Sequence, residues 1–88
     1  MRTIQIACQL SFCPLGKEQY RTEIDKVLKM INDSGLSAQV GSMSTVITGE
    51  SKVILSLLER IIQQQAEDEV QYIMNLAISN VCGCDVRI

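Results

Sequence analysis

The amino-acid sequence predicts one α/β domain in which two helices cover one face of a four-stranded antiparallel sheet. Three observations support this fold class. The chain has 88 residues, enough for a single compact core. Apolar and polar residues alternate near both ends, as in half-buried strands, and two segments between them carry apolar residues at helical spacing. We therefore expect residues 1–88 to form a single domain.

The first strand is expected over residues 3–13, where the alternation is strict. One face of this strand carries the apolar members, Ile4, Ile6, Cys8, Leu10 and Phe12. Proline cannot donate a hydrogen bond to a sheet, and glycine suits a turn. The segment Pro14-Leu15-Gly16 is therefore expected to end the strand.

A first helix is expected next, because apolar residues recur on a single stripe. That stripe consists of Tyr20, Ile24, Val27, Leu28 and Ile31. Gly35 is well placed as the residue just beyond the helix, where a left-handed conformation is common. We expect Leu36 to make the accompanying hydrophobic contact.

The second half of the chain predicts a hairpin, a helix and a final strand. Residues 37–40 and 44–49 are two short strand-like segments separated by Gly41-Ser42-Met43. A helix is expected from about residue 51 to about residue 66, with Ser51 as N-cap. Its buried stripe would be Ile54, Leu57, Leu58, Ile61 and Ile62. Residues 70–80 alternate again and predict the last strand.

The order βαββαβ, with two right-handed crossovers, is that of the ferredoxin-like sandwich, with strand order 4-1-3-2. One face of the sheet is left without helices, so it must be solvated, paired with a subunit or occupied by a ligand. We expect this open face to carry both uncharged polar residues and small apolar ones. Its residues would be Gln5, Ala7, Gln9, Ser11, Thr45, Asn75, Ala77 and Ser79.

Composition excludes several classes of function. The net charge of −2, with three aromatic residues, disfavours nucleic acid and anionic membrane surfaces, which require basic residues. Polar residues interrupt every apolar stretch before the length of about 20 residues that a membrane span needs. The N-terminal segment lacks the apolar core of a signal peptide, so the expected compartment is the cytoplasm.

Catalysis and metal binding are also disfavoured. The chain has no histidine, the commonest general base and metal ligand. Its four cysteines include the pair Cys82 and Cys84. In the predicted fold this pair lies roughly 30 Å from Cys13, at about 3.3 Å per residue. The four thiols cannot converge within one chain, so we expect no metal site. Cys13 without a histidine, together with scattered carboxylates, provides no nucleophile or acid-base pair, so we expect no enzyme.

Three segments resemble those of the YkoF-like thiamine-binding family: CQLSFCPLG at 8–16, MSTVITGE at 43–50 and IMNLAISN at 73–80. The resemblance implies reversible binding of thiamine or its hydroxymethylpyrimidine moiety, without catalysis. It also implies a homodimer or homotetramer in place of the family's tandem pair of units. Cys13 is a departure, since the family usually has tyrosine before the proline, and a thiol offers less stacking area.

Carried over residue by residue, the resemblance points to a ligand site formed by Gln9, Ser11, Ser44, Thr45 and Asn75. Amides and hydroxyls suit an aminopyrimidine, because they both donate and accept hydrogen bonds. For the thiazolium cation the nearest carboxylate in sequence is Glu50, whose place at a helix start is equally explained by the helix dipole. The alternative is a structural or regulatory assembly domain whose open face is covered by subunits. The sequence does not distinguish thiamine, its phosphates and the free pyrimidine as ligands.

Overall fold

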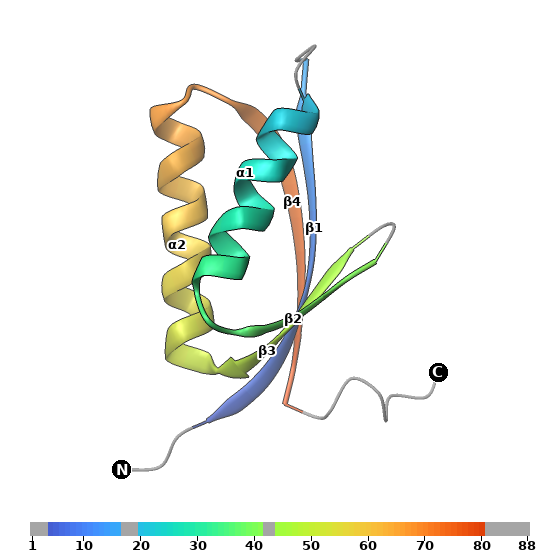
Figure 1. Cartoon of the computed structure of the whole chain (residues 1–88), viewed down its shortest axis with the longest axis vertical. Helices are drawn as coiled ribbons and strands as arrows, with labels where there is room; N and C mark the ends of the chain where they lie inside the picture. The colour runs from blue at the N-terminus through green and yellow to red at the C-terminus, as the bar shows by residue number, and fades with distance from the viewer. Residues whose placement is uncertain (1–3, 17–19, 42–43, 81–88) are drawn as a thin grey trace.

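The computed structural model of the protein describes residues 4–16, 20–41 and 44–80. Its elements are β1 (Gln5–Leu15), α1 (Tyr20–Asp33), β2 (Ser37–Val40), β3 (Thr45–Glu50), α2 (Ser51–Glu67) and β4 (Gln71–Ser79). The sheet order is β2-β3-β1-β4, with every neighbouring pair antiparallel. Both helices lie on one side of the sheet (Figure 1). The predicted ferredoxin-like order of elements and strands is confirmed.

The hydrophobic core lies between the helices and the two central strands. Its buried residues are Cys8, Leu10, Val27, Ile31, Ile47, Ile54, Leu57, Leu58 and Ile61. The helical stripe predicted for α2 is correct except at Ile62, which is 47% exposed. At 100° per residue, Ile62 falls on the flank of α2 rather than on the face that meets the sheet. The described residues contain no helix long and apolar enough to cross a membrane.

The first strand extends further toward the C-terminus than predicted, because it begins at Gln5 and continues through Pro14 to Leu15. Pro14 lies opposite Tyr72 and Leu15 lies opposite Gln71, both on β4. The described pairing of β1 with β3 ends at Leu10. A strand with one paired edge needs the N–H groups of alternate residues only, so it tolerates a proline. The expectation that proline ends this strand is therefore wrong.

The start of α2 also differs from the prediction. The N-cap is Glu50, which makes no side-chain capping hydrogen bond, and Ser51 is the first helical residue. Glu50 is still paired with Gln5 as the last residue of β3. The Ser51 N–H donates to the carbonyl oxygen of Ile4 at 2.8 Å. The chain therefore passes directly from strand to helix, with no residue between them for a serine cap.

The end of α1 confirms the predicted glycine stop. Gly35 has a φ of +80°, a conformation that glycine adopts without steric cost. Leu36 then turns inward and packs against the core. A Cβ added to Gly49 would lie 2.5 Å from Leu36 Cδ2, so the absence of a side chain on β3 makes room for this leucine.

Candidate functional site

Four of the predicted ligand residues gather on the open face of the sheet. Ser11 on β1 lies directly opposite Asn75 on β4. The side-chain amide of Gln9 donates a hydrogen bond to the hydroxyl of Ser44, with 3.1 Å between Nε2 and Oγ. Gln9 and Asn75 are exposed, whereas Ser11 and Ser44 are half-buried. Strand pairing thus brings together polar groups that are far apart in sequence.

Thr45 does not belong to this group. It lies opposite Leu10, on the face covered by the helices, and it is 5% exposed. The expectation that Thr45 faces the open side of the sheet is therefore wrong. Ile47 lies two residues further along the same strand and is buried in the core. Because side chains two residues apart on a strand point the same way, Thr45 must face the helices too.

Glu50 is also separated from the other predicted site residues. It lies opposite Gln5 at the far end of β3, about 17 Å from Thr45 at about 3.3 Å per residue. Thr45 and Glu50 occupy odd and even positions of the strand, so they face opposite sides of the sheet. The structure does not bring these two side chains into a common site. As the N-cap residue of α2, Glu50 stands at the helix end where an acidic residue is favoured by the helix dipole.

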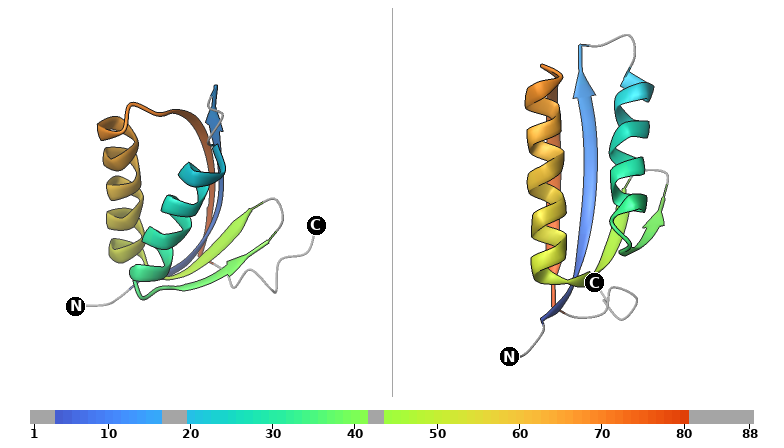
Figure 2. Two further views of the ribbon diagram at one scale, coloured as in Figure 1. Left: turned by 45° about the horizontal axis from the view of Figure 1, so that its top comes forward. Right: turned by 60° about the vertical axis from the view of Figure 1, so that its left-hand side comes forward.

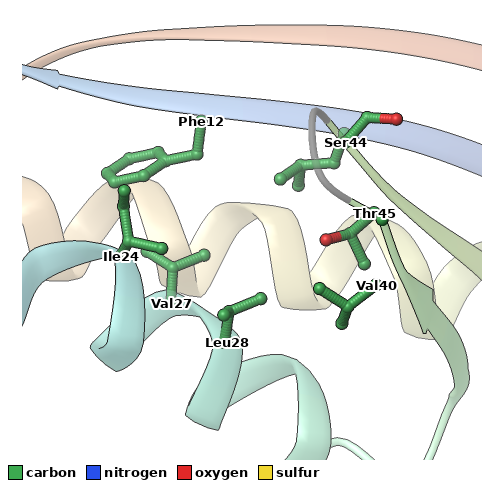
Figure 3. Close-up of a pocket in the computed structure, with 9 residues that line it drawn as sticks. Phe12, Ile24, Val27, Leu28, Val40, Ser44 and Thr45 are labelled. Atoms are coloured by element: carbon green, nitrogen blue, oxygen red, sulfur yellow. The ribbon is translucent and has the colours of Figure 1, made fainter. Parts of the chain in front are cut away.

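A pocket of about 160 Å³ lies between α1 and the helix-covered face of the sheet, close to the β2–β3 hairpin (Figure 3). It is lined by Leu10, Phe12, Ile24, Val27, Leu28, Val40, Gly41, Ser44 and Thr45. Figures 1 and 2 show the β2–β3 pair leaning away from the helices, which leaves this part of the sheet less closely covered than the centre. The lining has no acid or base, so the pocket suits an uncharged group.

The hydroxyl of Thr45 is the polar group that enters this pocket. In Figure 3 its oxygen points toward the aliphatic side chains of α1, whereas the oxygen of Ser44 points away from them. None of the described residues forms a hydrogen bond with the Thr45 hydroxyl. A hydroxyl can donate one hydrogen bond and accept two. Thr45 can therefore bind a polar atom of a ring that otherwise contacts only hydrocarbon.

One wall of the pocket is aromatic. The ring of Phe12 stacks on that of Tyr72, with centroids 5.5 Å apart and planes inclined by 30°. Stacking on Tyr72 holds the Phe12 ring in place where it lines the pocket. Phe12 belongs to the apolar face predicted for the first strand, but it is not among the predicted site residues. Phe12 and Leu10 lie two residues apart on one face of β1, next to the hairpin. This spacing is the sequence signal that could have identified Phe12 as a pocket residue.

Comparison with known proteins identifies the family. The model of the YKOF-related family matches residues 5–85. The chain belongs to this family. No curated protein sequence matches this YKOF-related chain.

Solved structures share its fold. A domain of unknown function, DUF77, from Bacillus cereus has a TM-score of 0.76 and 25% identity, over 88% of this chain and 76% of its own. A putative thiamine biosynthesis/salvage protein from Thermotoga maritima has a TM-score of 0.78 and 17% identity, over 96% of this chain and 90% of its own. A protein from Streptococcus pneumoniae has a TM-score of 0.80 and 18% identity, covering 93% and 92% of the two chains.

The thiols of this YKOF-related protein differ in environment. Cys8 is buried in the core, and that burial raises the pKa of its thiol above the usual value. Cys13 is exposed and lies opposite Ile73. The described residues contain no group of three metal-binding side chains. Cys82 and Cys84 lie outside the described residues, so the expectation of no metal site stays a prediction.

Proposed function

We propose that this protein reversibly binds thiamine or its hydroxymethylpyrimidine moiety, without chemical conversion, and that the pyrimidine ring enters the pocket between α1 and the sheet. Membership of the YKOF-related family supports the ligand class. The name of the structurally similar Thermotoga maritima protein, a putative thiamine biosynthesis/salvage protein, agrees with it. The observation that carries the proposal is a ring-sized apolar pocket with one unpaired hydroxyl.

The size of the pocket favours a single ring. An apolar cavity of about 150 Å³ in another protein accepts one benzene molecule. The pocket here is about 160 Å³, so it has room for a pyrimidine but not for both rings of thiamine. The thiazolium ring would then remain outside. A cation left in water avoids the large desolvation penalty of a buried charge.

The chemistry of the lining favours a neutral heterocycle over a plain hydrocarbon. The Thr45 hydroxyl has no hydrogen-bond partner among the described residues, and a ring nitrogen or amino group would supply one. A buried polar group left unpaired costs about 1–3 kcal/mol. Phe12 contributes an aromatic ring to the lining of the same pocket. A ligand lacking the polar atom would therefore bind more weakly than one that has it.

Calorimetric titration of the full chain with thiamine, hydroxymethylpyrimidine and the thiazole half tests this proposal. We expect the first two ligands to bind and to be recovered unchanged, and the thiazole half to give no heat. Thr45→Val keeps the shape of the side chain and removes its hydroxyl, so affinity should fall about 5- to 150-fold. Ser11→Ala also removes a hydroxyl, but on the open face, and it should leave affinity unchanged.

The same titrations contain the outcomes that would overturn the proposal. If Ser11→Ala weakens binding and Thr45→Val does not, the ligand binds on the open face, where Ser11 meets Asn75 and Gln9 meets Ser44. If no compound binds at millimolar concentration to correctly folded protein, the ligand class is wrong. A function in assembly without a small-molecule ligand would then be favoured.

A further inference from the structure

The main chain of β1 borders the pocket beyond the point where its pairing with β3 ends. β1 pairs with β3 as far as Leu10, opposite Thr45, whereas it pairs with β4 as far as Leu15. Between Leu10 and Leu15, one edge of β1 therefore has no strand partner among the described residues. Phe12 lies in this stretch and lines the pocket together with Gly41, from the end of the hairpin. In Figure 3, β4 lies on the other side of β1 from the pocket.

Two observations place the main-chain N–H and C=O of Phe12 on this unpaired edge. Alternate residues of a strand direct these groups to the same edge. The carbonyl oxygen of Ile4 accepts a hydrogen bond from the N–H of Ser51, which follows β3, so the even-numbered residues face the β3 side. Pro14 is also even-numbered, and it is tolerated because the N–H it lacks would point to the edge without a partner. The register of β1 with both neighbours is continuous, so Phe12 follows the same alternation.

A residue that directs both groups to one edge presents a donor beside an acceptor. In a complete antiparallel pair, such a residue exchanges two hydrogen bonds with the residue opposite. An aminopyrimidine carries the complementary pair, because its amino group donates and the neighbouring ring nitrogen accepts. The ring can therefore take the place of the opposite residue. Main-chain hydrogen bonds of this kind supply affinity when a peptide adds to the edge of a sheet.

The polar groups around the pocket match the polar atoms of the pyrimidine ring in number. The ring has an amino group and two nitrogens. Phe12 would bind the amino group and the nitrogen beside it, which leaves the second nitrogen for the hydroxyl of Thr45. Each polar atom of the ring then has a partner, as a buried polar group requires. The α1 side of the pocket supplies hydrocarbon alone, from Ile24, Val27 and Leu28.

We propose that the main chain of Phe12 determines the specificity of the pocket: its N–H donates to a ring nitrogen, and its C=O accepts from the adjacent amino group. This inference rests on the proposed function, since it places the pyrimidine in the pocket. The ligand class is then a single neutral ring with an amino group next to a ring nitrogen. An oxo group in place of the amino group reverses both partners, because the oxo oxygen accepts and the protonated ring nitrogen donates. Such a ring meets the Phe12 C=O with an acceptor and the N–H with a donor.

Calorimetric titration of the full chain with modified pyrimidines tests which edge of the ring is recognised. Compared with hydroxymethylpyrimidine, the analogue with hydrogen in place of the amino group should bind about 5- to 150-fold more weakly. The oxo analogue should bind more weakly still. If both analogues bind as tightly as hydroxymethylpyrimidine while Thr45→Val weakens its binding, the proposed function stands and the inference about Phe12 is wrong. If hydroxymethylpyrimidine itself does not bind, both are wrong.

A change to the backbone tests Phe12 itself. A synthetic segment 1–12 with oxygen in place of the Phe12 N–H can be ligated to residues 13–88, because the second segment begins with Cys13 and the junction keeps the natural sequence. This ester should bind hydroxymethylpyrimidine about 5- to 150-fold more weakly than the ligated protein with all its amides.

The matched control has the same ester at Ala7, whose N–H faces β4 and which lies about 16 Å along β1 from Phe12, at about 3.3 Å per residue. It should bind as tightly as the protein with all its amides. Circular dichroism checks that both esters fold. Equal affinities of the Phe12 and Ala7 esters would overturn the inference, whatever the effect of Thr45→Val.

Discussion

The side-chain amide of Gln9 donates a hydrogen bond to the hydroxyl of Ser44, across 35 positions of sequence and with 3.1 Å between the two atoms. Gln9 lies on the central strand, and Ser44 comes just before β3, at the end of the hairpin turn. The same turn is closed by Gly41, whose N–H donates to the Ser44 carbonyl oxygen at 2.8 Å. The bond therefore ties the hairpin to β1 beside the pocket.

This bond should contribute little to stability. It is exposed, so water competes for both groups, and net values for such bonds are about 0.5–1.5 kcal/mol. In a double-mutant cycle with Gln9→Ala and Ser44→Ala, followed by urea unfolding, we expect a coupling free energy at or below about 1 kcal/mol. A coupling of about 2 kcal/mol or more would contradict this, and would indicate that the two side chains belong to a larger buried network.

The fold was predictable because the strands and helices carry strong periodic patterns, but the site was less so. Alternation along β1 located the core, and Gly35 marked the end of α1. The prediction for Thr45 is wrong because its hydroxyl suits an open polar face, whereas the burial of Ile47, two residues along the same strand, places Thr45 on the covered face. The pocket itself depends on how far the hairpin leans from α1. That angle comes from the twist of the assembled sheet, which no local pattern encodes.

Gln65 is a buried polar residue that the predicted apolar stripe of α2 did not include. Its side chain is fully buried, and neither Oε1 nor Nε2 has a hydrogen-bond partner among the described residues. An unpaired buried amide costs about 1–3 kcal/mol. Gln65→Leu keeps a similar volume and continues the stripe from Ile61 at a spacing of four residues. It should therefore raise the free energy of unfolding, measured by urea titration, by about 1–2 kcal/mol.

Gln65→Glu, which keeps the shape and adds a charge, provides the matched comparison. It should destabilise the protein strongly at neutral pH and less in acid, because a buried carboxylate regains stability when protonated. If Gln65→Leu instead lowers the free energy of unfolding, the amide has a bonding partner in the folded protein, and the inference that it is unpaired is wrong.

Cys8 predicts a loss of stability in alkali. Burial raises the pKa of its thiol in the folded state, whereas an unfolded thiol titrates near about 8.5. Above that pH the unfolded chain releases this proton and the folded chain retains it, so the free energy of unfolding falls as pH rises. The stabilisation is fully present below about pH 8.5 and is lost as pH rises toward the folded pKa. The slope from Cys8 has a limit of about 1.4 kcal/mol per pH unit.

Urea titrations from pH 7 to pH 10 of the parent and Cys8→Ala measure this contribution, since all other titrating groups are common to both proteins. The variant is expected to be less stable at pH 7, because it leaves a cavity, but to lose less stability in alkali. Parallel pH profiles would show that Cys8 does not contribute. In the same buffers, an alkylating reagent should modify exposed Cys13 well before buried Cys8.

Filling the pocket should change binding and stability in opposite directions. Leu28 lines the pocket from α1 and is half-buried, so a larger ring at this position has room to enter. Leu28→Phe would occupy much of the space of about 160 Å³ and contact Phe12 across it. We expect thiamine affinity to fall at least about tenfold, while the free energy of unfolding stays constant or rises by about 0.5–2 kcal/mol, as for other cavity-filling changes. Leu28→Met, which conserves volume, is the control and should leave both quantities close to those of the parent.

A loss of affinity with an equal loss of stability would mean that Leu28→Phe disrupts the packing of α1. The effect of Thr45→Val on affinity would then decide whether the ligand enters the pocket. If Leu28→Phe is stable and binds thiamine as tightly as the parent, the ring does not enter this pocket.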